Sequence, residues 1–253
     1  MSKIEFTNKE AFNFAIAFIK GNWVLALVTT LIFTVLILLS YMPFPIGTLF
    51  SITYVVFSTS VQIYVARVAK ESYFIEDVEN KASNTNFSDF FLKYLQTALG
   101  FSAGIFLFTL IFVILLGIIL NILFPSLPDK ISLENLSNIP SQTLLLSSLI
   151  VLSLLSWFTY VGPAVSGKVF LAESFQEAFF KTFNIINPNF WAKTLSKRYF
   201  NYIVIWSFIV FALIIVMSLM LTSLIFIPIG LLILYFITLY NAIVFIYTDE
   251  KLK

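Results

Sequence analysis

The chain has 253 residues, of which 60% are apolar and only 11% are charged, and its formal net charge is +2. A soluble domain of this size carries about 25% charged residues, so this composition does not supply a water-facing surface. The sequence contains no Cys and no His, which excludes disulfides, thiol chemistry and acid–base schemes that need histidine. The small net charge gives no reason to expect a nucleic-acid partner.

Six apolar stretches are long enough to cross a bilayer as helices. A hydrocarbon core of about 30 Å needs about 20 apolar residues in a helix, and a helix pairs its own backbone amides inside lipid. None of the six stretches contains Asp, Glu, Lys or Arg. We therefore predict an all-α, polytopic transmembrane bundle whose six spans cover residues 23–41, 48–66, 100–123, 144–164, 202–223 and 231–247.

Basic residues predict the orientation of these spans. Of the 15 Lys and Arg residues, only Lys130 lies in a connection expected outside. Because Lys and Arg concentrate on the cytoplasmic side of membrane proteins, we predict a multi-pass protein of the cell (plasma) membrane with both termini cytoplasmic. The first apolar run is longer than the core of a signal peptide and lacks a small-x-small cleavage site, so we expect it to remain as a span.

Three connections on the basic side have the pattern of amphipathic helices. Their polar residues recur every three or four positions and so share one face, over residues 10–20, 87–99 and 171–186. Two of these segments align without gaps, matching Asp89–Lys93 to Glu177–Lys181, and each match predicts an ion pair between residues four apart.

The connections on the other side repeat as well. The sequence Phe-Pro-Ile-Gly at 44–47 and Ile-Pro-Ile-Gly at 227–230 are both interpreted as tight outer turns. We interpret the chain as one membrane domain of three hairpins, each preceded by a cytoplasmic amphipathic helix. The units cover approximately residues 8–68, 87–166 and 171–248. Chance similarity among Phe-rich helices is the alternative interpretation.

Several segments also carry a family resemblance. They are Tyr-Val-Ala-Arg-Val-Ala at 64–69, residues 86–100, Tyr-Val-Gly-Pro-Ala at 160–164, and residues 174–179 and 227–245. Together they resemble an uncharacterised, mainly archaeal membrane protein family, domain-of-unknown-function family 4013, over nearly the whole chain. Membrane domains of the glycerophosphodiester phosphodiesterase-associated type are distantly similar. The chain departs from the family pattern at Ile63 and in residues 76–88, which lack Pro and Trp. Because the family has no established activity, the resemblance implies a fold only.

Five residues are candidates for contact with a lipid or a substrate. Arg67 and Lys70 end the second span and suit a lipid phosphate, although a topology anchor explains them too. Pro163 breaks helical hydrogen bonding near the end of the fourth span, which fits either a substrate site or a bend. Gln62 and Asn241 are amides within spans, where bonds between helices are the alternative to ligand contacts.

Other motifs have structural interpretations. Gly100 and Gly104 form a small-xxx-small pair suited to close helix packing. Asn187-Pro188-Asn189 is interpreted as a turn, and the acidic run at 76–79 as a solvated loop, with a site for a hard cation as the alternative. Asn135 heads a glycosylation sequon in the largest outer connection.

These observations favour a non-enzymatic membrane component. We predict that it binds or moves lipid or small hydrophobic solutes, or organises partner proteins or copies of itself. It needs no cofactor and no metal. A secondary transporter or channel-like protein is the alternative, although ion coupling uses ionisable groups at depth and the six stretches have none. An intramembrane enzyme is the interpretation that the sequence supports least.

Overall fold

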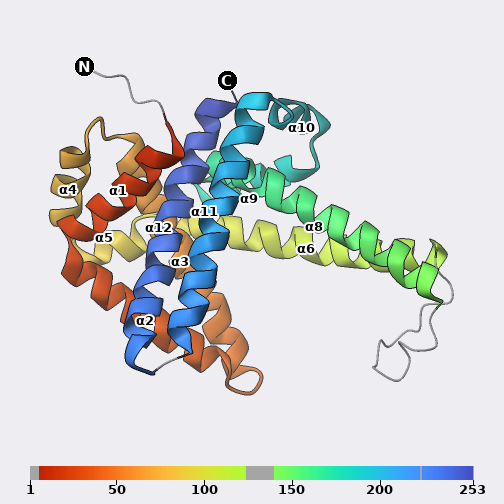
Figure 1. Cartoon of the computed structure of the whole chain (residues 1–253), viewed down its shortest axis with the longest axis horizontal. Helices are drawn as coiled ribbons and strands as arrows, with labels where there is room; N and C mark the ends of the chain where they lie inside the picture. The colour runs from red at the N-terminus through yellow and green to blue at the C-terminus, as the bar shows by residue number, and fades with distance from the viewer. Residues whose placement is uncertain (1–5, 124–139, 223, 253) are drawn as a thin grey trace.

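The structure, a computed structural model, describes residues 6–123, 140–222 and 224–252, and every element within them is a helix (Figure 1). Six of these helices are long and apolar enough to cross a membrane, which confirms the predicted helical membrane class. The connection with Lys130 and Asn135 lies outside the described residues. The six are α2 (Trp23–Ser40), α3 (Ile46–Lys70), α6 (Leu95–Leu123), α8 (Ser141–Phe170), α11 (Lys197–Leu221) and α12 (Ile227–Lys251).

Most of the long helices continue past the apolar stretch at one end. Helix α3 runs on to Lys70, α8 passes through Pro163 and ends at Phe170, and α12 includes Asp249 and Lys251. Lys residues in a last turn face the negative end of the helix dipole, which favours this extension. We call these extremities the basic ends of the spans, meaning the ends next to Lys20, Lys70, Lys93, Lys168, Lys197 and Lys251.

Shorter helices surround the basic ends. They are α1 (Asn8–Gly21), α4 (Ile75–Ser83), α5 (Phe87–Leu92), α9 (Phe175–Thr182), the 3-10 turn η1 (Phe183–Ile186) and α10 (Pro188–Thr194). Helix α1 covers the first predicted surface helix and begins at a capping box, in which Thr7 and Glu10 bond each other's backbone N–H groups.

The structure divides two of these segments and corrects the interpretation of two others. The stretch at 87–99 is two helices, because α5 ends at Leu92 and α6 begins at Leu95. The stretch at 171–186 is divided between α9 and η1. The supposed acidic loop is helix α4, and the supposed turn at Asn187 is the start of α10, where Pro188 occupies the first turn that tolerates a missing N–H.

The last outer turn also lies elsewhere than expected. Residues 227–230 belong to α12, with Pro228 in its first turn, and the 3-10 turn η2 (Leu224–Phe226) precedes them. Gly230 packs against the side chain of Leu221 at the end of α11. Proline at this position starts a helix, because the first-turn N–H has no helical acceptor in any case.

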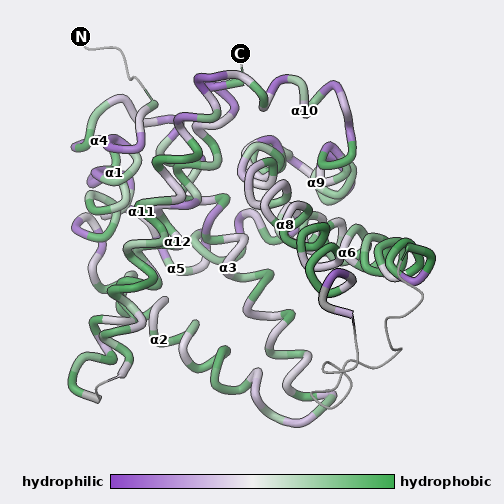
Figure 2. The backbone as a smooth tube through the Cα atoms, turned by 45° about the vertical axis from the view of Figure 1, so that its right-hand side comes forward, coloured by the Kyte–Doolittle hydropathy of each residue, from purple (hydrophilic) through white to green (hydrophobic). Residues whose placement is uncertain are grey.

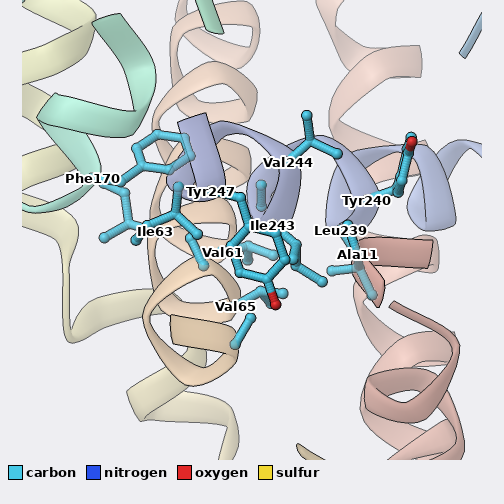
Figure 3. Close-up of a cluster of buried hydrophobic side chains, with 14 of the residues drawn as sticks. Ala11, Val61, Ile63, Val65, Phe170, Leu239, Tyr240, Ile243, Val244 and Tyr247 are labelled. Atoms are coloured by element: carbon cyan, nitrogen blue, oxygen red, sulfur yellow. The ribbon is translucent and has the colours of Figure 1, made fainter. Parts of the chain in front are cut away.

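Helix α12 forms the centre of the fold. Of the residues in its most apolar stretch 56% are buried, against 11% for α6, α8 and α11. It contacts α1, α2, α3, α8 and α11. Figure 3 shows its Leu239, Ile243 and Val244 among side chains from α3, α8 and α1. The core therefore forms around the last of the six spans.

The helix pair α6–α8 extends away from the other four spans, and both views show this divergence (Figures 1 and 2). Helix α6 packs mainly against α9 near its start, while α2 pairs with α3 and α11 with α12. Figure 2 shows apolar residues along the long helices and hydrophilic ones in the short helices around the basic ends. Much of the apolar surface of α6, α8 and α11 is thus left for lipid.

Two parts of the chain place buried residues at matching positions. Val78, Ala82 and Phe90 are buried in residues 61–93, and Ala178, Thr182 and Phe190 are buried at the matching positions of 161–193. The glycine contacts match as well. A Cβ on Gly21 would meet Glu79 and Ala82 of α4, and one on Gly104 would meet Phe179 and Thr182 of α9.

This correspondence differs from the alignment made from the sequence. It pairs Glu177 and Lys181 in α9 with Asp77 and Lys81 in α4, whereas the alignment paired them with Asp89 and Lys93. The ion pair between Glu177 and Lys181 is present at 2.6 Å. Asp89 accepts a hydrogen bond from Asn86, and the Lys93 ammonium lies over the rings of Tyr64 and Tyr94, so the second predicted ion pair is wrong.

Candidate functional site

A buried carboxylate joins the basic ends of three spans. The Asp249 side chain in the last turn of α12 is only 7% exposed. It forms an ion pair with Lys168 near the end of α8 and lies 4.0 Å from the Lys70 ammonium at the end of α3. The Lys70 and Lys168 side chains remain 35% and 38% exposed, so water still reaches both cations. Lys70 therefore faces a carboxylate of its own chain.

Arg67 connects α3 to the chain that leaves α8. Its Nε donates to the Phe170 carbonyl at 3.0 Å, and its Nη2 donates to the Ala172 carbonyl at 2.6 Å. Carbonyls at the end of a helix lack helical partners and carry the negative end of its dipole, so a guanidinium suits them. The guanidinium carbon also lies 4.5 Å from the centre of the Tyr94 ring. Arg67 thus has a structural role beside any contact with lipid.

Pro163 lies at a close contact between helices. It is buried, and its carbonyl accepts a hydrogen bond from the Thr248 hydroxyl at 3.4 Å. One turn later, a Cβ added to Gly167 would lie 2.1 Å from the Phe245 carbonyl oxygen. Helix α8 therefore presses its backbone against α12 over this turn, and no break in α8 opens a site there.

The two amides within spans differ in their surroundings. Asn241 in α12 accepts a hydrogen bond from the Trp206 indole of α11 at 2.8 Å. This bond joins neighbouring spans, as amides in membranes commonly do. Gln62 is half-buried on α3. Of the five candidates, Lys70 and Pro163 thus contact neighbouring residues of α12, Asp249 and Thr248. Asn241 joins α12 to α11.

A polar cleft opens where the basic end of α3 meets α4 and the junction of α5 with α6. Its volume is about 340 Å³. Lys93, at that junction, places its ammonium 5.9 Å from the centre of the Tyr64 ring and 5.6 Å from that of Tyr94. We call this feature the polar cleft, and it is lined by Tyr64, Arg67, Val68, Glu71, Asn80, Lys81, Asn84, Lys93 and Tyr94.

Two apolar grooves flank α8. The α8–α11 groove has a volume of about 610 Å³ and is lined by Leu152, Leu155, Ser156, Thr159, Tyr160, Ile203, Val204, Ser207, Phe208 and Phe211. The α6–α8 groove has a volume of about 510 Å³, and Trp157 of α8 and Trp191 of α10 meet edge to face in its lining. At the basic end, the Tyr199 hydroxyl of α11 donates to the Tyr160 carbonyl of α8 at 2.6 Å. Beyond that contact the two helices diverge (Figure 1).

The acidic residues of the short helices act mainly as caps. Asp77 accepts hydrogen bonds from the backbone N–H groups of Tyr73 and Phe74 at the start of α4. Glu177 receives bonds from Lys181 and from the Glu173 backbone, and these bonds lower the pKa of its carboxyl. In the described ranges no three carboxylates gather into a metal site, so the cation site proposed for residues 76–79 is not formed.

Sequence reasoning missed Asp249, Lys93 and Tyr94 as parts of these sites. For Asp249 a signal was present, because an acidic residue directly follows the last apolar run while two other runs end near Lys70 and Lys168. For Lys93 the misleading signal was Asp89, four residues earlier, which suggested an ion pair. The ring contacts of Lys93 depend on α3 lying beside the α5–α6 junction, and spacing along the chain does not contain that information.

Comparison with protein-family models, with curated proteins and with solved structures finds no match for this chain. The resemblance to family 4013 therefore stays a prediction.

Proposed function

We propose that the protein binds an acyl chain of a membrane lipid, or a small hydrophobic solute, in the α8–α11 groove, and that it does so without catalysis. The observation that carries this proposal is the divergence of α8 from α11 beyond the Tyr160–Tyr199 contact. The opening is on the side of the molecule, between two helices long and apolar enough to span a membrane. A groove in that position is entered from the lipid phase.

The lining of the α8–α11 groove suits hydrocarbon. Leu152, Leu155, Phe208 and Phe211 supply apolar surface along its length. The Thr159 hydroxyl is used internally, since it donates to the Leu155 carbonyl at 2.9 Å. Water filling such a space needs several polar partners, whereas an acyl chain needs none. Its volume lies within the range of about 300–1,000 Å³ typical of small-molecule sites.

The alternatives rest on weaker observations. A transporter coupled to ions needs ionisable groups at depth, and the charged contacts described above lie at the basic ends of the spans. An enzyme needs an available acid, base or nucleophile, yet Asp77, Asp249 and Glu177 are engaged as caps or ion-pair partners. A scaffold for protein partners is favoured by the exposed sides of α6 and α8, which lipid covers equally well.

Filling the groove tests the proposal. Ser156 lines the α8–α11 groove, and Ser153 on the same helix is also exposed but lines neither groove. Native mass spectrometry of the purified chain, titrated with phosphatidylcholine, measures lipid retention. We expect Ser156→Trp to retain several-fold less lipid than Ser153→Trp, because only the first indole occupies the groove. Equal retention by the two variants would remove the basis of the proposal.

We further propose that the basic ends face the cytoplasm of the cell and that the chain consists of three units of a surface helix and a hairpin. The distribution of Lys and Arg and the matched positions in 61–93 and 161–193 support this arrangement. Because the chain has no Cys, single-cysteine variants report topology directly. We expect a membrane-impermeant maleimide to label Ser137→Cys in intact cells, and Ser83→Cys only after the membrane is opened. Labelling of both in intact cells would overturn the orientation.

A further inference from the structure

The polar cleft carries a surplus of positive charge. Lys81 is paired with Glu71, whose carboxylate oxygen lies 3.9 Å from the ammonium. Arg67 gives two hydrogen bonds to carbonyls and is close enough to Glu177 to help lower the pKa of that carboxyl. Within the described part of the chain, the Lys93 ammonium contacts only the rings of Tyr64 and Tyr94. Three cations thus share a cleft with one lining carboxylate.

The cleft lies where the two matched parts of the chain differ. Tyr64 and Arg67 of α3 correspond to Ala164 and Gly167 of α8, both buried. Gly167 lets α8 press against α12, as described above. At the matching position in α3, Arg67 supplies a guanidinium to the cleft wall. Tyr64 and Arg67 therefore line the cleft at positions where the other matched part has small residues.

The surroundings of the cleft match the boundary of a membrane. The exposed side chains of Phe74 and Ile75 begin α4, and those of Phe87 and Leu92 lie on α5. Apolar residues of this kind enter the interfacial region of a bilayer when they sit on short surface helices. The cleft between these helices then lies at the depth of lipid phosphates, where basic residues attract anionic head groups.

We propose that the polar cleft binds a phosphate group, held by the Lys93 ammonium with Arg67 and Lys81 beside it and the amides of Asn80 and Asn84 as further donors. Charged donors make the strongest bonds to phosphate oxygens. The Glu71 carboxylate opposes binding and limits its strength. This site is separate from the α8–α11 groove and does not depend on lipid being held there. The phosphate belongs either to an anionic phospholipid or to a soluble anion.

The test compares two exposed lysines at matching positions. Lys93→Gln removes a cleft cation, and Lys193→Gln removes the same charge from α10, outside the cleft. The full chain is titrated with phosphatidylglycerol and with phosphatidylcholine in native mass spectrometry, and with inorganic phosphate in calorimetry. The Lys93→Gln variant should lose about five-fold in affinity, from about 1 kcal/mol per basic residue near an anionic surface. Lys193→Gln should match the wild type.

The Glu71→Gln variant should change phosphate binding in the direction opposite to Lys93→Gln. Removing the lining carboxylate should strengthen binding of the same probe that Lys93→Gln weakens, and Lys93→Arg should retain it. A response to phosphatidylglycerol alone identifies a lipid head group, and a response to inorganic phosphate identifies a soluble anion, and both support the site. Equal affinities of Lys93→Gln and Lys193→Gln for every probe would overturn the proposal, as would unchanged binding by Glu71→Gln.

Discussion

Two glycines offer a sharp test of the packing of α8 against α12. A Cβ added to Gly117 of α6 meets no atom within 4 Å outside its chain neighbours and its own helix backbone, whereas one added to Gly167 of α8 would lie 2.1 Å from the Phe245 carbonyl oxygen and 2.6 Å from the Thr248 hydroxyl. Carbon and a carbonyl oxygen approach to about 3.3 Å at closest, so α8 and α12 would have to separate by about 1 Å at Gly167. The obstacle is backbone, which does not rotate away.

The two Gly→Ala substitutions should therefore change stability in opposite directions. Alanine favours a helix over glycine by about 0.5–1 kcal/mol, and Gly117→Ala should show this gain alone. Gly167→Ala has the same gain but adds an overpacking cost of about 1–3 kcal/mol, which outweighs it. The two variants should therefore differ by the overpacking cost, about 1–3 kcal/mol in free energy of unfolding. Each substitution adds one methyl group inside a long helix, so Gly117→Ala is the control for Gly167→Ala.

The measurement is reversible unfolding in mixed micelles, with increasing sodium dodecyl sulfate and helix content followed by circular dichroism. If Gly167→Ala proves as stable as Gly117→Ala, then α8 and α12 do not approach as closely as described. The central position of α12 would then be in error.

Three further predictions concern the basic ends. Asp249→Asn should lower the free energy of unfolding by about 1.5–3 kcal/mol in the same assay, because it removes a charged bond to Lys168, whereas Glu76→Gln on exposed α4 should change it little. Arg67→Lys should lower the free energy of unfolding by about 0.5–1.5 kcal/mol, because an ammonium does not reproduce the two guanidinium bonds to the Phe170 and Ala172 carbonyls. An unchanged free energy of unfolding would contradict the structural role of Arg67. Because the pKa of Glu177 is lowered, its hydrogen bonds stabilise α9 fully at pH values above the ordinary pKa of 4.5. This stabilisation is lost as the pH falls through the lowered pKa. A carboxyl NMR titration should show the Glu177 pKa rising in Lys181→Met, and an unchanged pKa would contradict the assigned cause.

Hydropathy predicted the long helices, because each span needs a run of apolar residues and the sequence has six of them. It did not predict α4 or α10, which are too short to contain a long apolar run. Capping residues mark the starts of these helices, as where the Asn187 side chain accepts a bond from the Asn189 backbone N–H. A single capping residue is a weak signal in the sequence. In an acidic run, Asp77 resembles a loop residue, and the structure shows that it caps α4 by accepting bonds from the Tyr73 and Phe74 backbone N–H groups.

The candidate site was predictable in part. Arg67 and Lys70 were identified from their position after a span, yet their partners are carbonyls of Phe170 and Ala172 and the carboxylate of Asp249, all distant in sequence. Carbonyl groups occur at every residue, so composition does not indicate which of them accept such bonds. The register of the predicted repeat is ambiguous for a related reason. An acid followed four residues later by Lys occurs at both Asp77 and Asp89, and burial distinguishes the two.

The central place of α12 has a consequence for biogenesis. The ribosome releases the chain from its N-terminus at about 5–20 residues per second, so the other five spans, four of which contact α12, enter the bilayer before α12 is made. Until α12 arrives, the faces of α3 and α8 that it covers have only lipid or the insertion machinery against them. Asn8 in α1 accepts a hydrogen bond from the Tyr240 hydroxyl of α12. This bond cannot form until the ribosome has synthesised Tyr240. Assembly of this protein is therefore a late event that ties the two extremes of the described chain together in one step.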